Sequence, residues 1–362
     1  MSAPDRLEAP GGRRWPVAVL GATGAVGQTF VRLLARHPWF ELCGLAASER
    51  SAGRLYRDAA RWLEGDMPAA VAYQEVVPCD PAVVRAPIVF SALDAAAAQE
   101  IEPAFARAGA VVLSNARSFR MEPDVPLLVP EINPAHLSLL DAQRRLRGWD
   151  GAIVTNPNCS TAVLTMALAP LHQAFGVRGL FVATMQAVSG AGYPGVPSLD
   201  ILGNVIPFIG GEEEKIETET LKILGRADGD TISAAQMAIS AHTNRVAVEH
   251  GHTVCVSIAL ERRASVGDAL EVIQQWRGAP DARGLPSSPP LPLAYSDAAD
   301  RPQPRRDAGA GGGMTVTVGR LRPDPVLHLR LVAMGHNTIR GAAGASLLNA
   351  ELMAARGMLP DP

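Results

Sequence analysis

The stretch that decides the fold is Gly21-Ala-Thr-Gly-Ala-Val-Gly27, which follows an apolar run at Trp15–Leu20 and opens helical periodicity over residues 25–36. Glycines let a backbone turn approach a ligand closely, and a helix N-terminus offers unpaired N–H groups with a partial positive charge. The spacing is G-x-x-G-x-x-G rather than G-x-G-x-x-G, so the strand, turn and helix context carries the prediction of a dinucleotide site. The expected cofactor contacts are Gly21, Thr23, Gly24, Ala25, Val26 and Gly27.

Outward from this turn, apolar runs alternate with helical periodicity, which predicts parallel βαβ units with right-handed crossovers. After a helical run at Cys159–Phe175, strand-like runs follow with few helices between them, which predicts a mixed α+β unit. We expect strands there at residues 179–188, 244–248, 253–261, 314–320 and 326–333, with an irregular excursion at 286–313. The fold class is therefore α/β, a Rossmann-like dinucleotide-binding domain plus a mixed α+β catalytic and dimerisation domain. We place the dinucleotide-binding domain at residues 1–157 and 337–362, and the catalytic domain at 158–336.

The composition favours a small-molecule enzyme of the cytoplasm. The chain has 362 residues, of which 48% are hydrophobic and 19% charged, with a formal net charge of -3. Such a charge does not favour nucleic acid, and no apolar run approaches the roughly 20 residues that cross a bilayer. Residues 1–14 form a loose polar leader without a signal core. Four scattered cysteines without a CxxC pair indicate a reducing compartment and no disulfide framework.

The end of the second predicted strand bears on which dinucleotide is bound. An NAD enzyme often places a carboxylate there to hold the ribose hydroxyls. This chain has Ser48-Glu-Arg-Ser51, in which two hydroxyls and a guanidinium can ligate the extra 2′-phosphate of NADP. Glu49 argues against NADP, since its carboxylate could face the ribose hydroxyls, as in an NAD enzyme. NADP is the predicted cofactor, bound by Ser48, Arg50 and Ser51.

Cys159 is the candidate nucleophile, within Thr155-Asn-Pro-Asn-Cys-Ser-Thr161 between a strand end and a helical run. The helix dipole and free N–H groups are expected to lower its pKa. Asn158 could cap the helix or hold an oxyanion. The alternative is a buried structural cysteine behind a capping Asn. His252 is the candidate proton-transfer partner, with His242 and His250 as other possible bases. The His250-x-His252 pair has no Cys or carboxylate at ligand spacing, so no metal is predicted.

Together the motifs resemble the aspartate-semialdehyde dehydrogenase family, in its archaeal and fungal-type branch. They run in family order through the chain: Gly21–Gly27, residues 48–53, 114–121, 156–161, 186–190, Glu212-Glu-Glu-Lys215, residues 244–253 and 336–341. The resemblance implies that Cys159 is acylated, that His252 is the general acid/base, and that Gln186 orients the substrate. It further implies that Arg245 grips the α-carboxylate, that Glu212 meets the ammonium group, that Arg120, Lys215 and Asn158 hold phosphate, and that Ser189, Gly190 and Asn337 border the nicotinamide.

The implied reaction is NADPH-dependent reduction of L-aspartyl-4-phosphate to the semialdehyde with release of inorganic phosphate, in a homodimer or homotetramer. This substrate carries a carboxylate, a phosphate and an ammonium group. A site with cationic side chains at two points and an anionic side chain at one therefore matches it. One departure is Ala247, where the family usually has proline. Three alternatives stay open at this point. They are a malonyl- or succinyl-CoA reductase on the same scaffold, an N-acetyl-glutamyl-phosphate reductase, and a catalytically silent NADP-binding protein.

Overall fold

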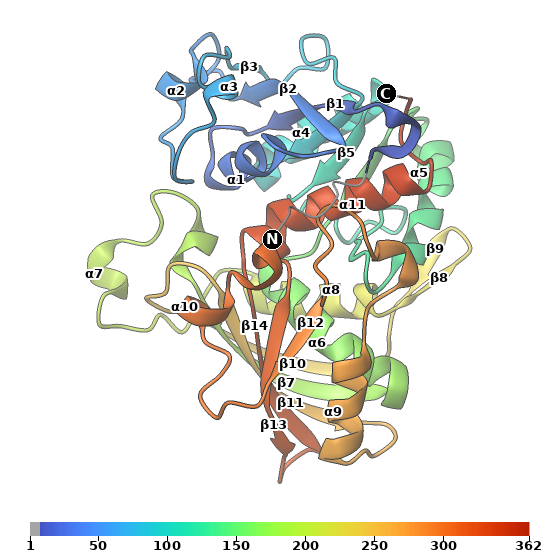
Figure 1. Ribbon diagram of the computed structural model, residues 1–362. Helices are drawn as coiled ribbons and strands as arrows, with labels where there is room; N and C mark the ends of the chain where they lie inside the picture. Colours follow the sequence, from blue (N-terminus) through green and yellow to red (C-terminus); the bar gives the residue numbers. More distant parts are fainter. Residues whose placement is uncertain (1–7, 362) are drawn as a thin grey trace.

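Two layered units, each built on a six-stranded sheet, make up residues 8–361, the part of the chain that the computed structural model describes (Figure 1). The first sheet is parallel throughout, in the order β3-β2-β1-β4-β5-β6. Its strands are β1 (Trp15–Leu20), β2 (Phe40–Ala47), β3 (Val77–Pro78), β4 (Ile88–Ser91), β5 (Val111–Ser114) and β6 (Ala152–Thr155). The order reverses between β1 and β4, and dinucleotides bind at the carboxyl ends of strands at such a point. The predicted Rossmann-like α/β fold is confirmed.

The C-terminal helix packs against this first unit. A π-helical turn at Ile339–Ala343 leads into α11 (Gly344–Ala355), which is buried along nearly its whole length. Leu347 and Leu348 share one hydrophobic core with Val17 and Phe30. A helix that is largely apolar around its circumference must be buried, so the return of the chain to the first unit follows from its composition. Other helices of this unit are α1 (Ala25–Leu34), α2 (Tyr56–Ala59), α3 (Ala69–Ala72), α4 (Ala95–Arg107) and α5 (Leu139–Arg147).

The second sheet is mixed, in the order β10-β7-β11-β14-β13-β12. Its helices α6, α8 and α9 contact the sheet and share a hydrophobic core with it. Its elements are α6 (Cys159–Phe175), β7 (Val177–Gln186), α8 (Glu212–Ile223), β10 (Ala238–Arg245), β11 (His252–Leu260), α9 (Val266–Gln275), β12 (Leu293–Ser296), β13 (Val316–Pro323) and β14 (Leu329–Gly335). Phe181 and Met185 of β7 alternate with its buried residues and are exposed, so they mark an opposite face that is open in the single chain.

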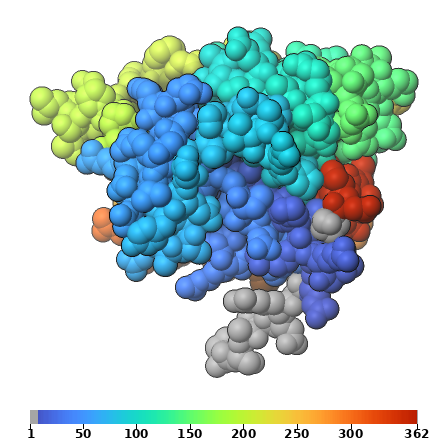
Figure 2. Space-filling view, turned by 90° about the horizontal axis from the view of Figure 1, so that it is seen from above, coloured from blue at the N-terminus to red at the C-terminus, as the bar shows by residue number. Residues whose placement is uncertain are grey.

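A peripheral arm and a small hairpin complete the second unit. The arm carries α7 (Ser198–Ile201), which projects from the body of the molecule in Figures 1 and 2. The hairpin joins β8 (Arg226–Asp228) to β9 (Thr231–Ser233). The limits assigned to the two domains, residues 1–157 with 337–362 and residues 158–336, stay a prediction.

Two sequence-based assignments in this unit were wrong. The strand expected at 244–248 is instead β10, Ala238–Arg245, which pairs in parallel with β7 along its whole length. The segment Ala238–Arg245 is poor in β-branched residues, so pairing with a neighbour, not local propensity, makes it a strand. The excursion at 286–313 is only partly irregular, because β12 joins the sheet edge beside β13 and α10 (Pro304–Asp307) forms a helical turn.

The polar leader is only partly described, since residues 1–7 lie outside the described range. From residue 8 onward the expectation of a loose segment was wrong. Ala9 is buried, and Arg14 Nη2 donates to the carbonyls of His37 (3.0 Å) and Phe40 (2.6 Å). Among residues 8–361 no helix has the length and apolar character needed to traverse a membrane. The four cysteines, all in this range, are unpaired, and the cytoplasmic location stays a prediction.

Candidate active site

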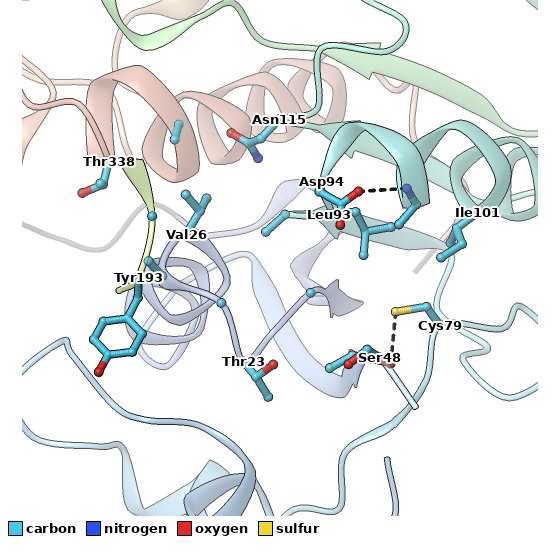
Figure 3. A pocket seen from close by; sticks show the side chains of 18 of the residues that line it. Thr23, Val26, Ser48, Cys79, Leu93, Asp94, Ile101, Asn115, Tyr193 and Thr338 are labelled. Carbon is cyan, nitrogen blue, oxygen red and sulfur yellow. Dashed lines mark hydrogen bonds between the residues drawn. The ribbon is translucent and has the colours of Figure 1, made fainter. Parts of the chain in front are cut away.

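A cavity of about 1060 Å³ lies at the carboxyl edge of the first sheet and extends to the start of α6. The glycine turn after β1, the ends of β2 and β4, and the segment around Asn337 contribute to its walls. Figure 3 shows Thr23 and Val26 from the glycine turn and Ser48 from the end of β2. Asn115 and Thr338 lie on another side of the same hollow. The cavity therefore joins the predicted dinucleotide turn to the predicted nucleophile.

The glycine turn is shaped for an anionic group, and each glycine has a different structural reason. Gly21 has φ +74°, and a Cβ there would lie 2.7 Å from the Ala92 carbonyl oxygen. A Cβ at Gly27 would lie 2.1 Å from the Gly21 oxygen, so this glycine serves close packing of helix on strand. Gly24 precedes α1, and no side chain caps that helix. The backbone N–H groups in the first turn of α1 are therefore free to bind a phosphate.

The end of β2 reaches the same cavity. Ser48, Glu49 and Arg50 all line it, whereas Ser51 does not. The Ser51 backbone N–H donates to the Ser48 carbonyl at 2.8 Å, which closes a tight turn. A hydroxyl, a carboxylate and a guanidinium thus all line this end of the cavity. Of the three residues predicted to bind NADP here, Ser48, Arg50 and Ser51, only Ser51 lies off the wall.

Cys159 begins α6, and the residue before it caps that helix as predicted. Asn158 Oδ1 accepts hydrogen bonds from the Ser160 N–H (2.9 Å) and the Thr161 N–H (3.3 Å). Cys159 Sγ lies 3.1 Å from His252 Nε2. Cys159 lines the cavity and His252 is completely buried behind it. The structure thus brings together the sulfur and the imidazole that the sequence separates by 93 residues.

The expected low pKa of Cys159 was wrong. Burial raises the pKa of the thiol to about 12, and the nearby Glu212 carboxylate adds to this, although Arg120 and Arg245 act in the opposite direction. A helix N-terminus stabilises an anion by up to about 2 kcal/mol, which lowers a pKa by only about 1.5. Desolvation therefore outweighs the dipole, and the free site holds a thiol.

His252 is neutral in this site. Burial lowers its pKa to about 3, with further effects from Arg245 and His336. The Ala187 N–H donates to Nδ1 at 3.0 Å, so the single proton of the neutral ring belongs on Nε2, facing the sulfur. The other two candidate bases lie elsewhere, since His242 contacts the Phe181 ring and His250 stacks on His336.

Charged side chains gather beside the sulfur, largely paired with one another. Glu212 accepts from Lys215 Nζ (2.7 Å), Asn158 Nδ2 (2.8 Å) and Gln186 Nε2 (3.3 Å). Burial would raise the pKa of Glu212, but the Lys215 charge and these hydrogen bonds outweigh burial and lower it. Arg245, which is buried, donates from Nη1 to the Ala187 carbonyl at 2.8 Å. This set offers cations and one anion within a small volume.

The far end of the cavity carries the residues predicted to border the nicotinamide. A Cβ added to Gly190 would lie 3.0 Å from Arg245 Nη1 and 3.1 Å from His252 Nε2, so this glycine lies closely against both side chains. Asn337 Nδ2 donates to Ser189 Oγ at 2.8 Å, and its Oδ1 accepts from the Gly251 N–H at 2.9 Å. Asn337 therefore ties the chain before α11 to the loop after β7.

Sequence reasoning missed two groups of residues at the site. Glu219 accepts from Arg120 Nη1 (2.9 Å) and from the Asn158 N–H (2.6 Å). Its signal was available, because it follows Glu212 by two helical turns and so lies on the same face. Asn115, Asn156 and Ser346 form a hydrogen-bonded polar network. Asn115 and Asn156 fall within the motifs at 114–121 and 156–161, but no role was predicted for either, and Ser346 lies outside every motif. Among residues 8–361 no group of three metal-ligating side chains occurs.

The comparisons with known proteins agree with this architecture. Residues 16–140 match a family described as semialdehyde dehydrogenase, NAD binding domain, and residues 168–340 match semialdehyde dehydrogenase, dimerisation domain. An aspartate-semialdehyde dehydrogenase of Methanothermobacter thermautotrophicus is 54% identical over 341 residues, covering 93% of this chain and 98% of that protein. The Schizosaccharomyces pombe protein of the same name is 45% identical over 353 residues, covering 95% and 99%.

Solved structures give the same result. The NADP complex of Candida albicans aspartate-semialdehyde dehydrogenase has a TM-score of 0.88 and 42% identity, over 95% of this chain and all of that one. The Vibrio cholerae aspartate-semialdehyde dehydrogenase II structure complexed with ASA has a TM-score of 0.73 and 28% identity, over 94% and 98%. Family matches to both units and relatives similar over nearly their full length leave one conclusion: the chain belongs to the aspartate-semialdehyde dehydrogenase family.

Proposed function

We propose that the chain catalyses the reduction of L-aspartyl-4-phosphate to L-aspartate 4-semialdehyde by NADPH, releasing phosphate, through a thioester on Cys159. The observation that carries the proposal is the 3.1 Å contact between Cys159 Sγ and His252 Nε2, on the wall of the cavity that starts at the glycine turn. A nucleophile beside a proton-transfer partner is what acyl transfer requires. A binding protein without catalytic function needs neither group.

In the first step, Cys159 Sγ forms a bond to the acyl carbon and the bond from that carbon to the phosphate oxygen breaks. The thiol is protonated in the free site, so its proton leaves with the phosphate. We assign Arg120, Lys215 and Asn158 to the phosphate, Arg245 to the α-carboxylate and Glu212 to the ammonium group. Gln186 orients the acyl group. Positioning of both reactants replaces an encounter in solution and lowers the barrier.

In the second step, the thioester carbon is reduced and the C–S bond then breaks, which returns the thiol and releases the aldehyde. A nicotinamide dinucleotide held by the glycine turn would supply the hydride. The Nε2 proton of His252 faces the sulfur, so it lies beside the oxygen that becomes negative on the carbon bonded to that sulfur. A fixed donor in a buried site stabilises such an oxyanion strongly. As acid/base, His252 passes its Nε2 proton to the departing sulfur, and one proton from solvent restores the ring, which completes the proton balance. In the opposite direction the same residues would bind the aldehyde and pass its acyl group to phosphate, while the oxidised dinucleotide would accept the hydride.

NADP is the proposed dinucleotide, in preference to NAD. The support is the presence of Ser48 and Arg50 on the cavity wall beside Glu49, together with the NADP in the Candida albicans complex. Gly21–Gly27 would hold the diphosphate, and Ser189, Gly190 and Asn337 the nicotinamide end. Replacing Arg50 with Ala should raise KM for NADPH about tenfold or more and leave KM for NADH nearly unchanged. Equal changes for both would contradict this assignment.

The test of the function is phosphate-dependent oxidation of aspartate semialdehyde, followed as NADPH formation. Cys159→Ala should abolish turnover and keep NADPH binding. Cys43→Ala is the matched control, because Cys43 is exposed and lies outside the cavity. Wild-type inactivity with aspartate semialdehyde, together with reduction of malonyl- or succinyl-CoA, would replace this function by the CoA-thioester one. Turnover by the Cys159→Ala protein would refute the nucleophile.

We also propose that two copies associate through the open face of the second sheet, as a homodimer or as the unit of a homotetramer. Phe181 (43% exposed) and Met185 (38% exposed) lie on that face, and it belongs to the segment that matches a dimerisation domain. Exposed apolar patches of this kind mark association sites. Phe181→Glu should shift the molar mass measured by light scattering to that of one chain, and an unchanged mass would exclude this face.

A further inference from the structure

Glu219 lies at the centre of a buried junction between three segments distant in sequence. It is 2% exposed and sits on α8. One carboxylate oxygen, Oε1, accepts from Arg120 Nη1 at 2.9 Å, and the other, Oε2, accepts from the Asn158 backbone N–H at 2.6 Å. Arg120 belongs to the loop after β5, and Asn158 to the turn between β6 and α6. A carboxylate with a donor on each oxygen has little freedom to move.

Asn158 is held at each of its remaining polar groups as well. Its Oδ1 caps α6 and its Nδ2 donates to Glu212. Two carboxylates of α8, Glu212 and Glu219, therefore accept hydrogen bonds from this one residue. Cys159 follows directly and begins the helix. Any displacement of Asn158 therefore moves the sulfur.

Two residues of α8 bind Arg120, one at its backbone carbonyl and one at its guanidinium. Lys222, three residues after Glu219, donates from Nζ to the Arg120 carbonyl at 2.7 Å, while Glu219 holds the guanidinium. Arg120 Nη2 donates to the Asn115 carbonyl at 2.6 Å. Its Nε is buried and has no partner among the described residues, and an unpaired buried donor is costly until an acceptor arrives. Arg120 lines the cavity, so its guanidinium charge is next to the space in which an anion would bind, although Nε itself is not exposed there.

We propose that Glu219 is a positioning residue that fixes Arg120 relative to the head of α6, and thereby sets the distance from the phosphate site to Cys159 Sγ. The proposal rests on the proposed function, because that function assigns Arg120 to phosphate. Glu219 touches no reacting atom. Its effect is exerted through Arg120 on phosphate binding and through Asn158 on the nucleophile.

Two substitutions separate these effects. Glu219→Gln keeps an acceptor for the Asn158 N–H and presents an amide donor to Arg120, so KM for phosphate should rise about tenfold or more with a smaller fall in kcat. Glu219→Ala also frees Asn158, and kcat should fall about 100-fold. Glu217→Gln is the matched control, since that carboxylate on the same helix accepts from the Ala241 N–H at 3.1 Å, remote from Asn158. It should have wild-type constants.

The decisive readout does not depend on turnover. Inorganic phosphate should protect Cys159 of the wild-type protein from alkylation by iodoacetamide. In the Glu219→Gln protein, the phosphate concentration that halves the alkylation rate of Cys159 should be about tenfold higher. In an Arg120→Ala background, Glu219→Gln should cause no further change, because the two residues act as one unit. Should Glu219→Gln fold poorly, Glu219→Asp replaces it, being too short to reach both donors, with the same expected rise.

The inference would be overturned if a folded Glu219→Gln or Glu219→Asp protein needed no more phosphate than the wild type for half-protection of Cys159. It would also be overturned if the effects of Glu219→Gln and Arg120→Ala on this phosphate concentration were fully additive. Failure of the proposed function looks different. In that case the wild-type protein itself shows neither phosphate-dependent oxidation of aspartate semialdehyde nor phosphate protection of Cys159.

Discussion

Gly341 lies directly against Cys159, the proposed nucleophile, and replacing Gly341 with alanine is a sensitive test of the site. A Cβ at position 341 would lie 2.5 Å from Cys159 Cβ and 2.8 Å from Cys159 Cα, whereas ordinary contacts begin at 3.4 Å. The two segments must therefore separate by about 1 Å. The π-helical turn that carries Gly341 cannot readily retreat, because Arg340 is buried, donates to Glu131 Oε1 at 2.6 Å and to the Met314 carbonyl at 2.7 Å. The strain thus falls on Cys159.

A misplacement of about 1 Å at a reacting atom costs roughly 100-fold in rate, and overpacking a buried contact costs about 1–3 kcal/mol of stability. We therefore expect Gly341→Ala to lower kcat about 100-fold while the protein remains folded. The assay is phosphate-dependent oxidation of aspartate semialdehyde, with thermal unfolding measured in parallel.

Gly267→Ala is the matched control. Gly267 is exposed within α9, and its added Cβ would meet only Ser265 Oγ, at 3.6 Å. Alanine is the better helix former by about 1 kcal/mol, so this variant should be fully active and no less stable. A Gly341→Ala protein whose kcat lies within about threefold of wild type would refute the claim that this contact positions the sulfur.

Three further outcomes follow from buried titratable groups. Burial raises the pKa of Glu102 from 4.5 to about 7. Between these pH values the folded protein keeps a proton that the unfolded chain loses, so stability falls as pH rises, by about 3 kcal/mol in total. Glu102→Gln should lack this fall in urea unfolding at about pH 4.5 and pH 8, and identical pH dependence of the two proteins would contradict the assignment. Because burial raises the pKa of Cys159 to about 12, its alkylation rate in the free protein should climb about tenfold per pH unit through pH 9, and a plateau below about pH 8 would show a thiolate instead. His252, whose pKa burial lowers to about 3, should contribute no inflection to kcat between about pH 5 and 8, and His252→Gln should lower kcat about 100-fold or more without removing any inflection present in that range.

The features that the sequence predicted correctly are those governed by local physics. The glycine turn before α1, the Asn158 cap and the start of α6 at Cys159 each depend on residues within a few positions of one another. Backbone freedom, capping and a sharp change in periodicity are readable at that range. The C-terminal helix was also predictable, because its apolar composition requires burial.

Other features depend on contacts between distant segments. β10 owes its limits to pairing with β7, and Glu219 matters only because α8 lies beside Asn158 and Arg120. The protonation of the central pair is the clearest case. A thiol at a helix N-terminus is expected to be acidic from sequence, yet its pKa is raised because desolvation by the surrounding fold is larger than the helix-dipole effect. The sequence determined which residues are proposed to carry the chemistry; folding decided their ionisation, because burial and charge pairing act through space and not along the chain.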